Sequence, residues 1–136
     1  MKTLSPRFFV RLFQSRFAAL VAAGTKLQTV RPKPARVPRV GDVIDCREWT
    51  GKPYRSKQRR ILEGKIVDVC EVIISDANVY KGTRIMDSEA FAKADGFASF
   101  SEMRDWFDEQ HGLPFRGILI RWKLARSLNP QLSPLN

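Results

Sequence analysis

Apolar positions recur along this chain with two different periods, and each period predicts a type of secondary structure. Alternating aromatic and branched residues predict strands over residues 7–13, 43–49, 65–74 and 116–123. Helical spacing predicts helices over residues 15–23, 87–93 and 100–111. Strands interleaved with short helices predict an α+β domain built on a small, strongly curved sheet.

Turn and cap residues set the expected boundaries of these elements. Ser5 and Pro6 would suit the start of one helix reaching Ala23, but the alternation after them favours a strand followed by a short helix. Ser99 with Glu102 forms a capping box, so the last helix should begin at residue 100, with Phe100, Met103, Trp106 and Phe107 as its buried face. Gly64 suggests a bulge before the strand over residues 65–74, and residues 75–81 read as a loop or short extension.

The junction over residues 24–31 gathers an unusual density of polar side chains. Gly24 can end the preceding helix with a positive φ, and Thr29 begins an extended segment. Lys26 and Thr29 would point to opposite faces of a regular strand, so they meet only if the chain turns between them. We expect Lys26, Thr29 and Arg31 to converge on one cleft, although an ordinary capped junction with exposed polar residues has a similar sequence.

The charge distribution favours a polyanionic partner. Lys and Arg number 24 against 14 acidic residues, which gives a net charge of +10. No acidic residue precedes Asp42, so the first third of the chain carries a concentrated positive field. RNA or another nucleic acid is the leading partner class, and an anionic membrane surface or simple solubility are the alternatives. The apolar run over residues 8–23 is interrupted by charge, so we expect no membrane span and a cytoplasmic protein.

A second basic cluster follows the turn after residue 50. Cations surround an aromatic side chain in this cluster, which comprises Lys52, Tyr54, Arg55, Lys57 and Arg59. Such mixtures hold phosphates and stack bases. Exposed hairpin tips are also often basic for solubility alone, and the sequence leaves both interpretations open.

The chain offers few metal ligands. Cys46 and Cys70 are too far apart for a CxxC site, and His111 is the only histidine. His111 before Gly112 is typical of the last turn of a helix. We therefore expect no metal and no cofactor.

Three segments in order resemble the ASCH (activating signal cointegrator homology) domain of the PUA-like superfamily. They are residues 17–31, residues 40–43, and a third set made up of residues 94–97, 99–107 and 117–122. The resemblance implies a PUA-like small curved β-barrel flanked by short helices, with residues 1–126 as a single domain. It also implies a cleft lined by residues 24–31 and a role in binding RNA. Residues 127–136, which contain two prolines, are typical of a flexible tail.

Some small bacterial proteins of the family that this chain resembles are amidohydrolases that deacylate N4-acetylcytidine with a Lys, a Thr and a Glu. Lys26 and Thr29 match two of these positions, whereas Asp95 stands where the family has the longer Glu. In that interpretation Thr29 attacks the amide carbonyl once Lys26 takes its proton, and Asp95 orients the amine. Asp95 would otherwise only cap a turn or favour a helix N-terminus.

The sequence thus supports two functions of different classes. The first is binding of RNA or a nucleotide by Lys26 and Arg31 together with the basic cluster. The alternative is an amidohydrolase of modified nucleosides that uses Lys26, Thr29 and Asp95. A ribonuclease is less favoured, because no pair of histidines is present for acid and base catalysis.

Overall fold

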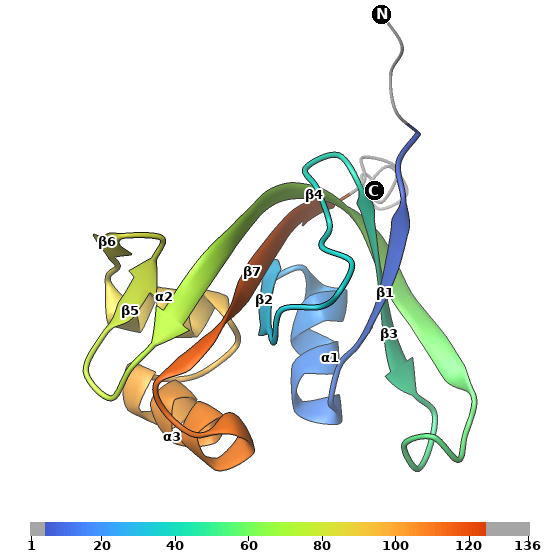
Figure 1. Ribbon diagram of the computed structural model, residues 1–136. Coiled ribbons are helices and arrows are strands. Elements are labelled where there is room, and N and C mark those ends of the chain that lie inside the picture. The colour runs from blue at the N-terminus through green and yellow to red at the C-terminus, as the bar shows by residue number, and fades with distance from the viewer. Residues whose placement is uncertain (1–4, 125–136) are drawn as a thin grey trace, which may run out of the picture.

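The computed structural model describes residues 5–124 and folds them into one mixed sheet with three helices (Figure 1). The strands are β1 (Phe8–Leu12), β2 (Gln28–Arg31), β3 (Val43–Trp49), β4 (Gln58–Ile74), β5 (Val79–Lys81), β6 (Arg84–Ile85) and β7 (Phe115–Leu124). The helices are α1 (Ser15–Ala23), α2 (Ser88–Ala94) and α3 (Phe100–His111). The predicted α+β class is confirmed, whereas the predicted tail over residues 127–136 lies outside the described residues.

The sheet is organised around the long strand β4. The first half of β4 pairs with β3, and the second half pairs with β7 and, at its end, with β5. β1 runs parallel to β3, and β2 runs antiparallel to β7. Within residues 5–124 the sheet is open, because no strand pairing joins β1 to β2.

β4 differs from the prediction, because it begins at Gln58 and spans 17 residues. The expected bulge at Gly64 is wrong: Gly64 pairs regularly with Ile44 and Leu124, and the register instead shifts at Ile61 and Val67. Glycine is needed here for another reason, since a Cβ at this position would lie 2.5 Å from Cδ1 of Trp122. The register shifts accompany the bend of β4 that Figure 1 shows.

Residues 79–85 form a hairpin that the sequence pattern did not indicate. β5 and β6 contain only three and two residues, too few to show a period. They form because the end of β4 offers an unpaired edge to Val79 and its neighbours. The prediction of a loop or short extension over residues 75–81 is therefore only partly right, because residues 79–81 form β5.

Local capping chemistry marks the end of α1 and the starts of α2 and α3. α1 ends at Gly24, which has a φ of 79°. α2 begins after Asp87, whose side chain accepts a hydrogen bond from the Ala90 N–H. α3 begins after Ser99, whose hydroxyl accepts from the Glu102 N–H, so the predicted cap is confirmed.

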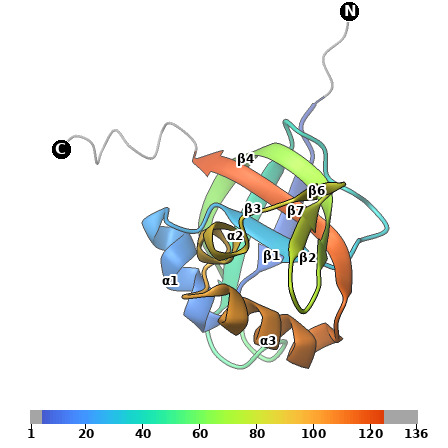
Figure 2. The same ribbon diagram turned by 90° about the vertical axis from the view of Figure 1, so that its left-hand side faces the viewer.

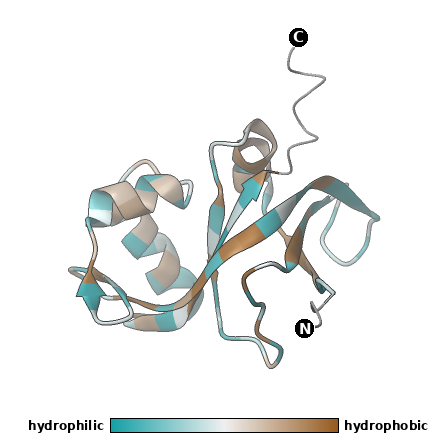
Figure 3. Ribbon diagram, turned by 90° about the horizontal axis from the view of Figure 1, so that it is seen from above, coloured by the Kyte–Doolittle hydropathy of each residue, from teal (hydrophilic) through white to brown (hydrophobic). Residues whose placement is uncertain are grey.

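The core lies between the sheet and the helices. α2 and α3 cover the end of the sheet near β5 and β6, and α1 packs against β3 and β4 (Figures 1 and 2). Buried and more exposed positions alternate over residues 62–67 of β4, as expected for a strand with one covered face, and Figure 3 shows hydrophobic and hydrophilic residues interspersed along the strands. Of the predicted apolar face of α3, Phe100, Met103 and Phe107 are buried, whereas Trp106 is only half-buried. None of the helices in residues 5–124 is long and apolar enough to cross a membrane.

Candidate functional site

One pocket collects the polar side chains that the sequence singled out. Lys26, Thr29, Arg31 and Asp95 all line a cavity of about 220 Å³. The predicted convergence of Lys26, Thr29 and Arg31 is therefore confirmed. The remaining lining residues are mostly aromatic or apolar and comprise Leu12, Phe13, Gln14, Phe17, Val30, Pro32, Phe97, Trp106, Phe107 and His111.

Lys26 reaches the pocket because the chain does not become a strand directly after α1. The N–H groups of Thr25 and Lys26 both donate to the Leu20 carbonyl, and β2 begins only at Gln28. The alternation of a strand therefore does not apply to Lys26. Gly96 gives its alkyl chain room, since a Cβ on Gly96 would lie 3.1 Å from Cδ of Lys26.

Lys26 and Asp95 form a buried pair that joins segments far apart in the sequence. The ammonium of Lys26 donates to the backbone carbonyl of Asp95 at 2.5 Å and lies 3.5 Å from its carboxylate Oδ1. The two side chains are 3% and 4% exposed. Gln28 Nε2 also donates to Oδ1 of Asp95, at 3.2 Å. Asp95 is the C-cap residue of α2 through its backbone, but in the part of the chain that the structure describes no backbone N–H donates to its carboxylate, so the side chain is held by the pocket and caps neither a turn nor a helix N-terminus.

Burial acts on both members of the pair in the direction of their neutral forms. It lowers the pKa of Lys26, and the nearby charge of Arg31 lowers it further, while Asp95 opposes the shift. Burial likewise raises the pKa of Asp95, against the opposing effect of Lys26. The pocket therefore makes the loss of a proton from Lys26 easier than it is in water.

Thr29 and Arg31 form the second polar pair of the pocket. They lie on one face of β2, and Arg31 Nε donates to Oγ1 of Thr29 at 2.9 Å. Arg31 Nη2 also donates to the carbonyl of Leu12 at 2.9 Å, and its guanidinium lies 4.8 Å from the centre of the Phe13 ring. Arg31 thus connects β2 to the end of β1, where the sheet is open. Burial, aided by the charge of Arg11, lowers the pKa of Arg31 to about 10.

Lys26 and Thr29 both line the pocket, but within residues 5–124 no hydrogen bond joins their side chains. The ammonium of Lys26 is directed to Asp95, and Oγ1 of Thr29 accepts from Arg31. Because that oxygen accepts the bond from Arg31, the hydroxyl proton of Thr29 remains available to a ligand or a base.

Sequence reasoning missed the aromatic wall of this pocket and the contact of Gln28. Trp106 and Phe97 are 5.7 Å apart between ring centres, and His111 lies 6.4 Å from Trp106. The helical period assigned Trp106 to the core, and the position of His111 indicated only a helix end. Their place in the pocket follows from the way α3 packs beside the turn after α2, for which no local sequence signal exists.

The basic cluster predicted to bind nucleic acid lies at the tip of the β3–β4 hairpin and, with Arg59, on the start of β4, and it does not line this pocket. Tyr54 has a φ of 63° and is 87% exposed, and its ring lies 5.2 Å from that of Trp49. Arg59 forms an ion pair with Glu48 at 3.1 Å. Within the described residues, the cluster's other three cations form no ion pair; they are Lys52, Arg55 and Lys57.

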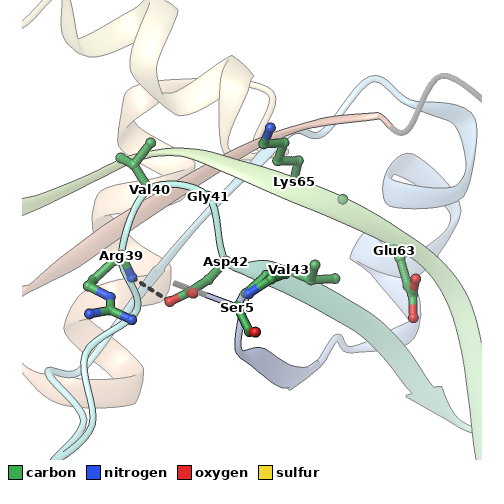
Figure 4. Close-up of a pocket in the computed structure, with 10 residues that line it drawn as sticks. Ser5, Arg39, Val40, Gly41, Asp42, Val43, Glu63 and Lys65 are labelled. Atoms are coloured by element: carbon green, nitrogen blue, oxygen red, sulfur yellow. Dashed lines mark hydrogen bonds between the residues drawn. The ribbon is translucent and has the colours of Figure 1, made fainter. Parts of the chain in front are cut away.

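A larger hollow of about 730 Å³ lies near the start of β3 (Figure 4). Its ionisable side chains Arg39, Glu63 and Lys65 are partly or fully exposed and lie apart from one another (Figure 4). The buried carboxylate there, Asp42, is already satisfied by Arg7 and Arg39. The smaller pocket is therefore the better candidate site, because only there do buried polar groups converge.

The candidate site has no metal-ligating cluster. Among residues 5–124, no three His, Cys, Asp or Glu side chains gather as metal ligands would. Comparison with models of protein families, with curated proteins and with solved structures finds no match, so function is inferred from the pocket itself.

Proposed function

We propose that this protein binds RNA or a nucleotide by enclosing one base in the pocket lined by Lys26, Thr29, Arg31 and Asp95. The single observation that carries the proposal is the combination of an aromatic wall with convergent buried polar groups in one cavity. Proteins that recognise single-stranded RNA stack splayed bases on aromatic rings and bond the base edges. The pocket offers both kinds of contact.

The polar groups are complementary to the edge of a cytosine-like base. Asp95 can accept from an exocyclic amine, and Lys26 and Arg31 can donate to ring carbonyl or nitrogen acceptors. Thr29 can do either. The volume of about 220 Å³ is smaller than the 300–1,000 Å³ that is usual for drug-sized ligands, so a single base suits it better than a longer unit.

The family proposed from the sequence agrees with this site. We keep the ASCH assignment, and with it a curved PUA-like barrel that no strand pairing between β1 and β2 closes within residues 5–124, as part of the proposal. The segments that carry the resemblance include the junction over residues 24–31 and the turn at Asp95–Phe97, and both contribute to the pocket. The segment over residues 40–43 contributes the buried Asp42, which positions the start of β1.

Removing the aromatic wall should weaken RNA binding. We expect Trp106→Leu to raise the Kd for a short cytosine-containing single-stranded RNA by about tenfold, because stacking on an aromatic ring stabilises binding by about 1–3 kcal/mol per base. Fluorescence anisotropy of a labelled octanucleotide measures the effect, and thermal unfolding verifies that the variant is folded. An unchanged Kd in a folded Trp106→Leu protein would contradict the proposed base pocket.

The hairpin cations provide the matched control for this measurement. Replacing Lys52, Arg55 and Lys57 by Ala should make the affinity for RNA less dependent on salt, because fewer counterions are released on binding. The ratio of affinities for cytosine-containing and uracil-containing RNA should stay unchanged in this variant. If the variant bound cytosine-containing and uracil-containing RNA equally well, base recognition would lie on the hairpin and not in the pocket.

A second candidate function is the deacylation of an N4-acylated cytidine. The observation that favours it is the buried Lys26, whose pKa is lowered, in the same pocket as the Thr29 hydroxyl. Neutral Lys26 would take the hydroxyl proton while Oγ1 of Thr29 bonds to the acetyl carbon, and the proton would pass to N4 of the departing cytidine. Water would then cleave the acetyl ester, releasing acetate and restoring Thr29.

This second function predicts a specific pattern of variants. Incubation with N4-acetylcytidine should release cytidine and acetate, Thr29→Val should abolish turnover, and Thr29→Ser should retain part of it. Asp95→Glu should raise turnover by restoring the longer acid of the family that the chain resembles. Chromatographic detection of cytidine decides between the two functions. If the protein binds RNA but releases no cytidine, only the binding function remains supported.

A further inference from the structure

A row of arginines and aromatic rings leads along β1 to the pocket. Phe9 and Arg11 share one face of β1, and Phe13 follows directly after the end of that strand. Arg36, from the loop after β2, lies 4.4 Å from the centre of the Phe9 ring, and Arg11 lies 5.7 Å from it. Arg31 lies over Phe13 in the pocket itself. Three cations from three segments therefore lie over two rings, Arg11 and Arg36 over Phe9 and Arg31 over Phe13.

These three arginines are held together without acidic partners. In residues 5–124, neither Arg11, Arg31 nor Arg36 forms an ion pair with an Asp or Glu. By contrast, Arg7 also lies over the Phe9 ring, at 5.0 Å, but is paired with Asp42 at 3.0 Å. The row therefore carries positive charge that no ion pair within residues 5–124 neutralises, although the charge of Asp95 acts on Arg31 from within the pocket.

The arginines repel one another as neighbours of like charge do. Burial lowers the pKa of Arg11 and the charge of Arg36 lowers it further, and Arg11 in turn lowers the pKa of Arg31. An anion placed between them would relieve this repulsion.

The arginines also keep hydrogen-bond donors free. Arg11 uses Nη1 on the carbonyl of Val10, at 2.8 Å. Arg31 uses Nε and Nη2 on Thr29 and Leu12. The described residues offer no hydrogen-bond partner to Nη1 of Arg31, to Nη2 of Arg11 or to the guanidinium of Arg36. Since a guanidinium binds phosphate oxygens in a planar, often bidentate arrangement, these free donors suit a phosphate group.

We propose that Arg11, Arg31 and Arg36 form a phosphate-binding site beside the base pocket, so that the ligand is a phosphorylated nucleotide unit and not a free nucleoside. This inference rests on the proposed function, because the phosphate is expected to belong to the nucleotide whose base fills the pocket. Arg31 links the two sites, since it lines the pocket, bonds Thr29 and lies next to Arg11. The phosphate is either the terminal group of a mononucleotide or a phosphodiester of RNA.

Binding of three matched ligands tests this site. Cytidine, cytidine 5′-monophosphate and the trinucleotide CpCpC are titrated into the full-length protein by isothermal titration calorimetry at fixed salt. We expect the monophosphate or the trinucleotide to bind at least tenfold more tightly than cytidine. A tighter monophosphate assigns the site to a terminal phosphate, whereas a trinucleotide that binds more tightly than the monophosphate assigns it to a phosphodiester.

Charge-matched variants locate the effect. Arg11→Gln should abolish most of the preference for the phosphorylated ligands and leave the affinity for cytidine unchanged. Arg36→Gln, at an exposed position, should reduce the preference for the phosphorylated ligands by a smaller factor. It serves as the test if Arg11→Gln does not fold. Arg39→Gln is the control, because Arg39 is exposed in the same loop and its backbone N–H, not its side chain, bonds Asp42.

The outcomes separate this inference from the proposed function. Equal affinity of the wild-type protein for cytidine and its phosphorylated forms overturns the phosphate site but leaves the base pocket intact. Equal losses in Arg39→Gln and Arg11→Gln overturn it as well, because the effect would then be one of general charge. If neither the three ligands nor the octanucleotide RNA binds, the proposed function itself fails.

Discussion

Replacing Lys26 by Met should lower the free energy of unfolding by about 3–5 kcal/mol at neutral pH, because it removes one member of a buried ion pair. The carboxylate of Asp95, 4% exposed, would lose the ammonium beside it and keep only the hydrogen bond from Gln28. Met preserves most of the volume of the Lys alkyl chain, so the loss reports on charge more than on packing. Urea denaturation followed by circular dichroism measures the difference.

The double variant Lys26→Met/Asp95→Asn is the control for this interpretation. Asn removes the unpaired charge and still offers an oxygen to Gln28 Nε2, so the double variant should be more stable than Lys26→Met alone. A double variant as unstable as the sum of the two single ones would mean that the pair is not coupled. A Lys26→Met protein as stable as the wild type would show that the buried pair does not contribute to stability.

The pH dependence of the Lys26→Met variant has a definite sign. Burial raises the pKa of Asp95, and removing Lys26 removes an effect that opposes this shift. A group whose pKa is higher in the folded than in the unfolded state contributes stability below its unfolded pKa, about 3.9 for Asp, and loses it as the pH rises. The stability deficit of Lys26→Met should therefore shrink as the pH falls toward 4 and grow above that pH.

Replacing Asp42 by Ala should also lower the free energy of unfolding by about 3–5 kcal/mol, because Asp42 joins two segments on its own. Its carboxylate accepts from the backbone N–H of Arg7 at 3.0 Å and of Arg39 at 2.8 Å, and from the guanidinium of Arg7 at 3.0 and 3.2 Å. Without it, these donors at the start of β1 and in the loop before β3 lose their partner. The parallel pairing of β1 with β3 should loosen, and hydrogen exchange at the β1 amides should quicken.

Acid should erase the difference between wild type and Asp42→Ala. Burial alone would raise the pKa of Asp42, but the hydrogen bonds from Arg7 and Arg39 and the charge of Arg7 outweigh it and lower the pKa. The carboxylate therefore contributes its stability above the unfolded pKa of about 3.9, and this contribution is lost as the pH falls through the lower folded pKa. Asp76→Asn, at an exposed turn, is the matched control and should change stability little at any pH.

The loss of β1 pairing would also reach the candidate site. Arg11 and Leu12 lie on β1, and Leu12 accepts a hydrogen bond from Arg31 in the pocket. Asp42→Ala should therefore weaken the binding of phosphorylated ligands more than that of cytidine. If a destabilised but folded Asp42→Ala protein bound the phosphorylated ligands and cytidine with the same affinities as the wild type, β1 would not need this anchor to hold the site.

The amino-acid sequence by itself determined the elements whose signals are local. Gly24 ends α1 because glycine adopts a positive φ without steric cost, and Ser99 starts α3 because its hydroxyl satisfies a free backbone N–H. Alternation predicted most strands for the same reason, since side chains two residues apart share a face. The polar junction over residues 24–31 identified Lys26, Thr29 and Arg31 as candidate site residues. Only the family resemblance added Asp95.

Only the tertiary structure decided which distant residues meet. Asp95 is 69 positions from Lys26 in the sequence, and no local pattern specifies that separation. The full length of β4, the short hairpin of β5 and β6 and the place of His111 in the pocket depend on neighbouring strands and helices in the same way. Arg11, Arg31 and Arg36 form a row because β1, β2 and the following loop pack together around Phe9 and Phe13. Short-range sterics and backbone hydrogen bonds act within a few residues, whereas the pocket and its charge arise from contacts that exist only once the sheet and helices have packed.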